Sequence, residues 1–98
     1  MAKFIQIVEF KSDRGDEVLA LGDDMESRRS EGTVRRINVT KDRDRPGYFF
    51  SIIEFDSYEE AMENSNRPET SEFAEKMGKL CDGPPTFRNL DVTRTWQA

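Results

Sequence analysis

The chain has 98 residues, with 15 Lys and Arg against 20 Asp and Glu, one cysteine and no histidine. Domains usually take about 100 to 200 residues, so we expect residues 1–98 to form a single domain. Without histidine the chain cannot build a Ser-His-acid triad, a Cys-His dyad or an imidazole metal site. The net charge of −5 disfavours nucleic acid as a partner.

The composition predicts a folded, cytoplasmic protein. Seven Phe, two Tyr and one Trp supply core material that a disordered chain lacks. No segment approaches the roughly 18 consecutive apolar residues of a membrane helix, and the N-terminal sequence lacks the pattern of a secretory signal. The single cysteine, Cys81, cannot form an internal disulfide, which is typical of a reducing compartment. We therefore expect no membrane partner.

The first part of the chain predicts a strand, a helix and a second strand. Residues 3–10 alternate with period two and carry apolar side chains on both faces. A helix is expected to begin at Ser12 or Asp13 and to end before Gly32. Residues 33–41 form a polar strand suited to the edge of a sheet.

The remaining chain predicts a buried strand, a broken helix and a last polar strand. Residues 48–55 form the most apolar stretch and are expected to be a central strand. Ser57 with Glu60 is a capping-box pattern that begins a helix, and Pro68 indicates a break followed by a second helical piece. The last strand is expected over residues 86–96.

Residues 42–47, with the sequence DRDRPG, predict a turn between the second and third strands. The same residues begin like a calcium loop, with Asp42 and Asp44 in a D-x-D arrangement. The twelfth position of that pattern is Ile53 rather than glutamate, and Pro46 replaces a ligand. Turn chemistry therefore explains the segment better than a metal site, and we expect no metal.

The predicted order is βαββαβ, which indicates an α+β, ferredoxin-like fold with a four-stranded antiparallel sheet. The two apolar strands are expected in the centre, with the helices on one face of the sheet. The other face still carries about three large apolar side chains from each central strand, too much apolar surface for a monomer. We expect a second copy of the chain to cover it as a homodimer.

Residues 51–77 (SIIEFDSYEEAMENSNRPETSEFAEKM) resemble the dimeric α/β-barrel superfamily, which includes domains of the antibiotic-biosynthesis-monooxygenase type. The likeness lies in a third strand that ends in an aromatic, Phe55, followed by a Ser-led helix with Ala61 and a second helical piece. The resemblance implies that two sheets close a barrel in the dimer. It also implies that any ligand lies between the sheet and the helices of one subunit.

The resemblance separates two kinds of activity. The haem-degrading branch uses an Asn on the first strand, a Trp on the second helix and a haem-ligating His. Here the first strand offers Gln6 and Val8, the helix offers Asn64 and Ser65, and histidine is absent, so that branch is excluded. The cofactor-independent monooxygenases of the group need no histidine and stay open, and we expect no cofactor.

RNA-binding domains share the βαββαβ order, but residues 48–55 do not fit their RNP1 pattern. Tyr48 stands where a basic residue belongs, Phe49 where glycine belongs and Ile52 where a stacking aromatic belongs. We therefore expect no nucleic-acid partner.

The polar residues of the predicted strands and helices supply the candidates for a ligand pocket. A lone amide on a central strand needs a hydrogen-bond partner, either in the protein or in a ligand. Arg35 and Arg36 alternate faces of the second strand, so one of them serves either as an ion-pairing edge residue or as an anchor for an anion or enolate. The candidates are Gln6, Arg36, Asn38, Asn64 and Trp96.

Two functions of different class follow. The first is a small dimeric protein that binds an apolar or aromatic molecule or serves an accessory role, because no acid-base pair is visible. The second is a cofactor-independent monooxygenase or isomerase, which rests on the resemblance alone. Polar candidates that converge in an open space between sheet and helices would support a reaction, whereas a filled interior would contradict both functions.

Overall fold

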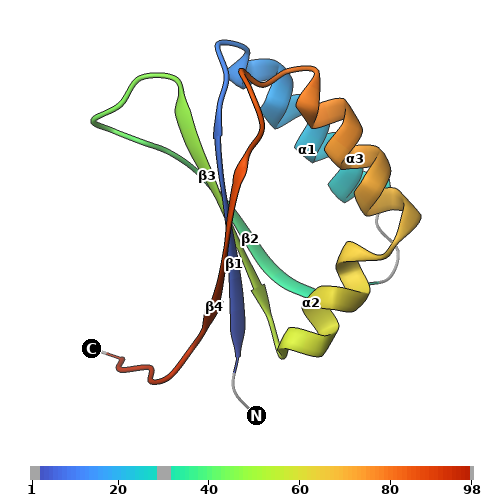
Figure 1. The fold of residues 1–98 in the computed structure, drawn as a ribbon, viewed down its shortest axis with the longest axis vertical. Helices are drawn as coiled ribbons and strands as arrows, with labels where there is room; N and C mark the ends of the chain where they lie inside the picture. Colours follow the sequence, from blue (N-terminus) through green and yellow to red (C-terminus); the bar gives the residue numbers. More distant parts are fainter. Residues whose placement is uncertain (1–2, 29–31, 98) are drawn as a thin grey trace.

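The computed structural model describes residues 3–28 and 32–97 and has the predicted βαββαβ order, with the second helix in two pieces (Figure 1). The elements are β1 (Phe4–Lys11), α1 (Gly15–Arg28), β2 (Val34–Lys41), β3 (Tyr48–Phe55), α2 (Tyr58–Ser65), α3 (Pro68–Gly78) and β4 (Thr86–Asp91). The predicted α+β, ferredoxin-like fold is confirmed.

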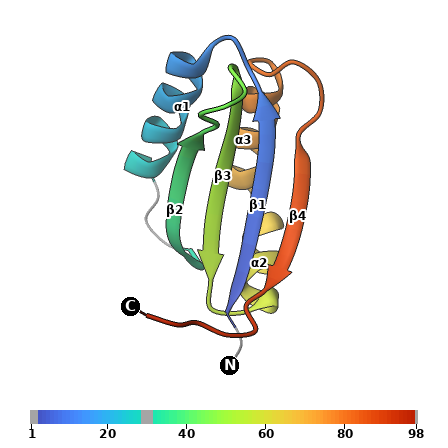
Figure 2. The ribbon, with the colours of Figure 1, turned by 90° about the vertical axis from the view of Figure 1, so that its left-hand side faces the viewer.

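The four strands form one antiparallel sheet in the order β2-β3-β1-β4 (Figure 2). The two apolar strands β1 and β3 are central and the two polar strands are edges, as the sequence predicts. All three helices lie on the same side of the sheet (Figure 1). One face of the sheet is therefore helix-facing, and we call the other the open face.

The strand register arranges the helix-facing side chains in four rows across the sheet. In order along the strands, the rows are Val34, Phe55, Phe4 and Asp91; Ile37, Ile53, Gln6 and Asn89; Val39, Ser51, Val8 and Phe87; and Lys41, Phe49 and Phe10. We call the first and last of these the end rows and the other two the middle rows.

The hydrophobic core lies over the end rows in two separate clusters. At one end Phe4 and Phe55, with ring centroids 6.4 Å apart, are buried against Ala61 of α2. At the other end Phe10 and Phe49 stack at 5.4 Å and are buried with Val18 of α1. Each cluster therefore fixes one end of the helical layer to the sheet.

No helix covers the open face (Figure 2), and a strip of apolar side chains crosses its centre. Ile7 lies directly opposite Ile52 in the centre, and Ile5 lies opposite Leu90 on the edge strand β4. Ile5, Ile7 and Ile52 are only half-buried, and Leu90 is exposed. The expected apolar face is present on the side away from the helices.

The helix ends follow the predicted signals with one correction. Ser57 caps α2 by accepting a hydrogen bond from the Glu60 backbone N–H at 3.2 Å, and Pro68 begins α3. The first helix begins at Gly15, later than predicted; before it the buried Ser12 side chain donates to the Leu80 carbonyl and accepts from the Arg14 N–H. An added Cβ at Gly15 would lie 2.8 Å from the Phe49 ring, so this close approach requires glycine.

The last strand is shorter than predicted, because it ends at Asp91 rather than near Trp96. Its only neighbour in the sheet is β1, and Asp91 pairs with Phe4, the first residue of β1. One further hydrogen bond joins the Val92 N–H to the Lys3 carbonyl at 2.9 Å. Among the residues that the structure describes, this is the last backbone hydrogen bond between the two chain ends.

The turn predicted for residues 42–47 forms, and its aspartate stabilises the turn as the sequence indicated. The Asp42 carboxylate accepts hydrogen bonds from the Asp44 backbone N–H and from Arg45 Nε, both at 2.9 Å. Gly47 has a φ of 86°, in the left-handed region that glycine tolerates. Within residues 3–28 and 32–97 no group of three acidic, cysteine or histidine side chains could hold a metal.

Asp42→Asn is expected to destabilise the protein at neutral pH and to leave its stability less sensitive to acid. The hydrogen bond from the Asp44 backbone, and then that from the Arg45 side chain, hold the pKa of the Asp42 carboxyl below its ordinary value. A carboxyl with a lowered folded-state pKa contributes stability above the unfolded-state pKa, and this contribution disappears as pH falls through the folded-state pKa. Urea unfolding at neutral and acidic pH measures the difference.

Asp44→Asn is the matched control, because it removes a carboxylate from the same turn but leaves the Asp44 N–H in place. Its effect should be smaller than that of Asp42→Asn at neutral pH. Equal losses for the two variants would contradict the assigned role of Asp42.

Candidate functional site

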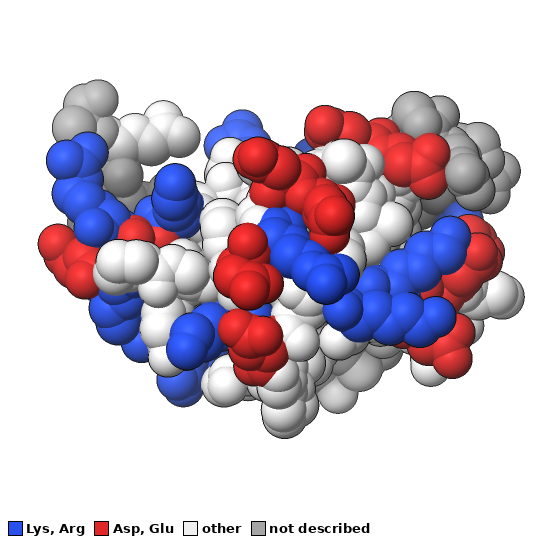
Figure 3. Space-filling model, turned by 90° about the horizontal axis from the view of Figure 1, so that it is seen from above, with Lys and Arg blue, Asp and Glu red and all other residues white. Residues whose placement is uncertain are grey.

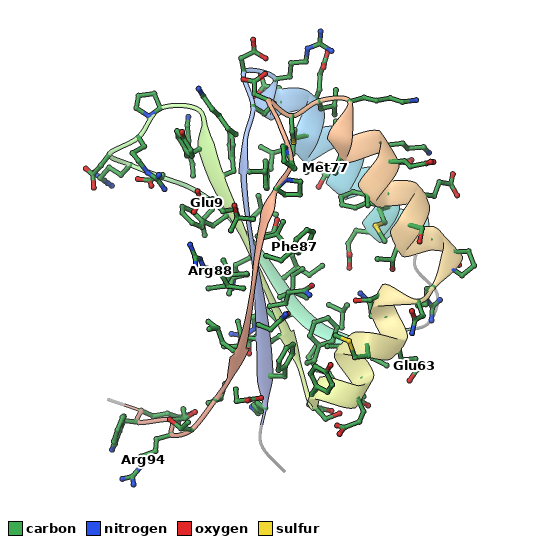
Figure 4. The ribbon with its side chains drawn as sticks, viewed as in Figure 1. Glu9, Glu63, Met77, Phe87, Arg88 and Arg94 are labelled. Carbon is green, nitrogen blue, oxygen red and sulfur yellow. The ribbon has the colours of Figure 1, made fainter. Side chains whose placement is uncertain are left out.

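The middle rows of the helix-facing side are incompletely covered, although they lie under the helices. Their edge residues Ile37, Val39 and Phe87 are 41%, 43% and 57% exposed. Phe87 points from β4 toward the helical layer (Figure 4). In the centre of these rows Ile53 and Val8 pack against the two core clusters, so the exposure lies at the two edges; we call the two rows the midsheet patch.

A pair of amides supplies the polar groups of the midsheet patch. Gln6 Nε2 donates to Asn89 Oδ1 across the β1–β4 pairing at 3.2 Å. Half-buried Ser51 on β3 adds a hydroxyl in the neighbouring row. An amide carries two donors and an acceptor with two lone pairs, so the Gln6–Asn89 bond leaves hydrogen-bonding capacity on both side chains.

The helices above the patch present apolar side chains. On α1, half-buried Leu21 and Met25 are spaced three and seven residues after buried Val18, which places them on the same side of the helix. On α3, half-buried Phe73 and Met77 are four residues apart, and Met77 points toward the sheet (Figure 4). The patch therefore combines an apolar surround with a few polar groups, which is typical of a small-molecule site.

The chemistry of the patch favours binding over acid-base catalysis. Its two rows contain amide and hydroxyl groups but no carboxylate, lysine or arginine. An amide can orient a carbonyl or hydroxyl group of a ligand, but it does not titrate near neutral pH. The patch can therefore hold and orient a molecule without supplying a proton acceptor.

The structure separates the five residues that the sequence selected. Gln6 lies in the midsheet patch, whereas Arg36 and Asn38 lie on the open face beside Glu54 and Ile52. These three side chains cannot converge on one ligand because the sheet stands between them. Arg36 Nε lies 3.8 Å from the Glu54 carboxylate, so the arginine forms an ion pair on the open face.

The two other candidates lie outside the strands of the sheet. Asn64 is half-buried on α2, three residues after buried Ala61 and therefore near one core cluster. Trp96 follows the end of β4 and is 83% exposed. Asn89 belongs to the site but was not selected from the sequence, because only the β1–β4 register reveals that it lies opposite Gln6.

Arg35 is the edge arginine that pairs with an acidic helix. A β-bulge between Val34 and Arg36 interrupts the register, and Arg35 bonds Asp56 through Nε at 2.7 Å. The same guanidinium lies 4.0 Å from Glu60 in the first turn of α2. Arg35 therefore ties β2 to the start of α2 and does not act as an anchor for an anion in the midsheet patch.

A hollow opens at the end of the molecule formed by the β1–α1 connection and the β2–β3 hairpin. It has a volume of about 800 Å³. Basic and acidic side chains alternate over this end, as Figure 3 shows from above. Its charged lining includes Lys11, Arg14, Lys41, Asp13, Asp16 and Glu17. Because the two signs are mixed, the hollow selects neither an anion nor a cation.

The single cysteine packs against the hydrophobic core. Cys81 is half-buried against the cluster of Phe10 and Phe49. Burial, and next the neighbouring Asp82 carboxylate, raise the pKa of the Cys81 thiol. A raised pKa keeps the sulfur protonated, so the residue is a poor nucleophile.

No helix of the described residues is long and apolar enough to cross a membrane.

The fold is shared with several solved structures. A protein from Caulobacter crescentus CB15, proposed to be an antibiotic biosynthesis monooxygenase, superimposes with a TM-score of 0.82 at 13% identity, over 95% of this chain and 92% of its own. A conserved protein of Methanosarcina mazei Go1 gives 0.80 at 11% identity, over 92% of each chain. Rv0793 of Mycobacterium tuberculosis gives 0.79 at 18% identity, over 97% of this chain and 99% of its own.

These likenesses define the class of fold. No family model and no curated protein matches the sequence. The resemblance to antibiotic-biosynthesis-monooxygenase-like proteins is therefore confirmed at the level of the fold, over nearly the whole chain.

Proposed function

We propose that this protein binds a small, largely apolar molecule that carries a carbonyl or hydroxyl group, at the midsheet patch. The observation that supports the proposal is the amide pair of Gln6 and Asn89, set between exposed apolar side chains that a folded core would normally cover. An aromatic ligand would lie against Phe87 at the β4 edge, while its oxygen bonds the neighbouring amide of Gln6 or Asn89. The role is binding or accessory, in the cytoplasm, which the single cysteine supports.

We also propose that the protein acts as a homodimer through the open face. Ile5, Ile7, Ile52 and Leu90 form an apolar strip on a chain whose small size limits its core. A second copy brings an identical strip, and two-fold symmetry is the usual way to pair a surface with itself. The midsheet patch lies on the other side of the sheet, so each subunit keeps its own binding site.

Replacing the two amides is expected to remove the preference for oxygenated ligands. Calorimetric titration with 1,4-naphthoquinone and with naphthalene should give tighter binding of the quinone to the wild type. A hydrogen bond contributes about 0.5–1.5 kcal/mol, so Gln6→Leu with Asn89→Leu should weaken quinone binding roughly 2- to 12-fold and leave naphthalene binding unchanged or tighter.

Asn38→Leu is the matched control, because Asn38 is an amide on the same sheet but on the open face. It should leave both affinities unchanged. Binding that is equal for the two ligands, or lost equally in the control, would contradict the assignment of the midsheet patch.

A second candidate is a cofactor-independent monooxygenase, favoured by the names of structural neighbours such as the Caulobacter crescentus CB15 protein. In such a reaction the protein would hold an electron-rich phenol or hydroquinone while dioxygen attacks it. Conversion of 1,4-dihydroxynaphthalene to 2-hydroxy-1,4-naphthoquinone, with one oxygen atom of dioxygen in the product and the other released as water, would establish this function if the double amide variant lost it. A rate equal to that of the free hydroquinone in buffer would leave binding as the function.

A further inference from the structure

One side of α1 touches the sheet at a first glycine and leaves space at a second. Gly15 and Gly22 are seven residues apart, so they lie on the same side of the helix. A Cβ added at Gly15 would lie 2.8 Å from the Phe49 ring. A Cβ added at half-buried Gly22 would have no atom within 4 Å outside its own stretch of helix, among the residues that the structure describes. The space between α1 and the sheet therefore widens from the first glycine to the second.

This space lies beside the midsheet patch, on the β2 side of the sheet. Figure 2 shows α1 beside β2, running back along the sheet from the end at which β1 finishes. Gly22 is about 10 Å further along the helix than Gly15, and the two middle rows are about 7 and 14 Å further along the strands than Phe49. In those rows the β2 side chains, Ile37 and Val39, are exposed. Helix and strand thus leave the same region uncovered.

Glycine is an unfavourable residue for the middle of α1. In a helix interior it shifts the folding equilibrium roughly two- to fivefold toward the unfolded state relative to alanine. At Gly15 the close approach of the Phe49 ring requires glycine, but at Gly22 no such contact is present among the described residues. What Gly22 provides is room, because any side chain at this position would enter the space.

One middle row changes from apolar to polar across the sheet, toward the amide pair. From β2 to β4 this row consists of Ile37, Ile53, Gln6 and Asn89. Neighbouring strands are about 4.8 Å apart, so β1 with Gln6 lies about 10 Å from β2 with Ile37. A molecule held by its oxygen at the amides and directed across Ile53 therefore reaches the space beside Gly22.

We infer that the ligand is elongated, with its oxygenated end at the amides of Gln6 and Asn89 and a hydrocarbon chain in the space beside Gly22. The inference rests on the proposed binding at the midsheet patch. The half-buried neighbours of Gly22 on this side of α1, Leu21 and Met25, are apolar, as are the facing residues of β2. Such a lining accepts an uncharged hydrocarbon group and disfavours a charged one. Gly22 therefore sets the size of the group that the site accepts at this end.

Calorimetric titration with 1,4-naphthoquinone and with 2-pentyl-1,4-naphthoquinone tests the inference. The pentyl chain should tighten binding to the wild type roughly tenfold or more, because each buried methylene contributes about fourfold. Gly22→Leu fills the space, so it should remove most of this gain and leave the affinity for 1,4-naphthoquinone unchanged. Gly22→Ala should remove less of it. In urea unfolding both variants should be at least as stable as the wild type, because alanine and leucine favour a helix more than glycine does.

Gly78→Leu is the matched control. An added Cβ at Gly78 also has open space around it within the described chain, but Gly78 is exposed at the last residue of α3. This variant should bind both quinones as the wild type does, and an equal loss there would overturn the inference.

Three further results would contradict the elongated ligand and leave binding at the midsheet patch standing. They are a wild type that gains nothing from the pentyl chain, a gain that persists in Gly22→Leu, and a Gly22→Leu variant less stable than the wild type. The last result would mean that the space is packed in solution. A wild type that binds neither quinone would overturn the proposed function together with the inference.

Discussion

Replacing Phe55 with alanine is expected to lower the free energy of unfolding by about 3–5 kcal/mol. Phe55 is 1% exposed and packs on Phe4 and Ala61, so it joins the central strand to α2. Truncation removes the apolar contacts and leaves a cavity that the flanking strand and helix cannot close. Small domains have a total stability of only about 5–15 kcal/mol, so a large fraction of it would be lost.

Phe87→Ala is the matched control, because it removes the same side chain from the same side of the sheet. Phe87 is 57% exposed and lies in the midsheet patch rather than in a core cluster. Its loss should cost less than about 1 kcal/mol. Urea unfolding of the two variants measures the contrast, and comparable losses would mean that the midsheet patch is part of the packed core.

The contrast between these two phenylalanines divides the molecule into parts with different tasks. The end rows hold the helices on the sheet through two pairs of buried aromatic rings. The middle rows carry Gln6, Ser51 and Asn89, polar groups that weaken a core and suit a binding site. Stability from the two clusters therefore permits polar groups and exposed edge residues in the middle rows.

The fold could be predicted from the sequence because its signals are local and repeated. The two-sided apolarity of residues 3–10 and 48–55 is the pattern of central strands, and the polar residues 33–41 are typical of an edge. Ser57 and Pro68 marked the starts of α2 and α3 from their own chemistry. The errors fell on the start of α1 and the end of β4, where contacts distant in sequence decide the boundary.

The site could be predicted only in part because it depends on register between distant strands. Gln6 was visible as an amide in an apolar run, but its partner Asn89 is 83 residues away. Arg36 and Asn38 fall on the open face because a bulge at the start of β2 sets the phase of the strand. Alternation along a strand predicts which residues share a face, but it does not say which face the helices cover.

Ile52→Glu is expected to convert the proposed dimer into a monomer. This result would show that the open face is the interface between two copies. Ile52 lies in the middle of the central strand, opposite Ile7, where two copies related by a two-fold axis would meet. Burial of an unpaired carboxylate costs several kcal/mol, so the dimer affinity should fall roughly 100-fold or more. Sedimentation velocity at micromolar concentration measures the change.

Ile37→Glu is the control that separates the two faces of the sheet. It introduces the same charge on β2, but on the helix-facing side, where Ile37 is 41% exposed. This variant should remain dimeric and should lose affinity for apolar ligands instead.

Both variants should keep their secondary structure, because neither isoleucine is fully buried in the subunit. The unfolding temperature of the wild type should rise with protein concentration, since dissociation accompanies unfolding, whereas that of Ile52→Glu should not. A wild type that sediments as a monomer would mean that the apolar strip of the open face is covered by something other than a second copy. In that case the small hydrophobic core of each subunit would have to stabilise the fold without a second copy.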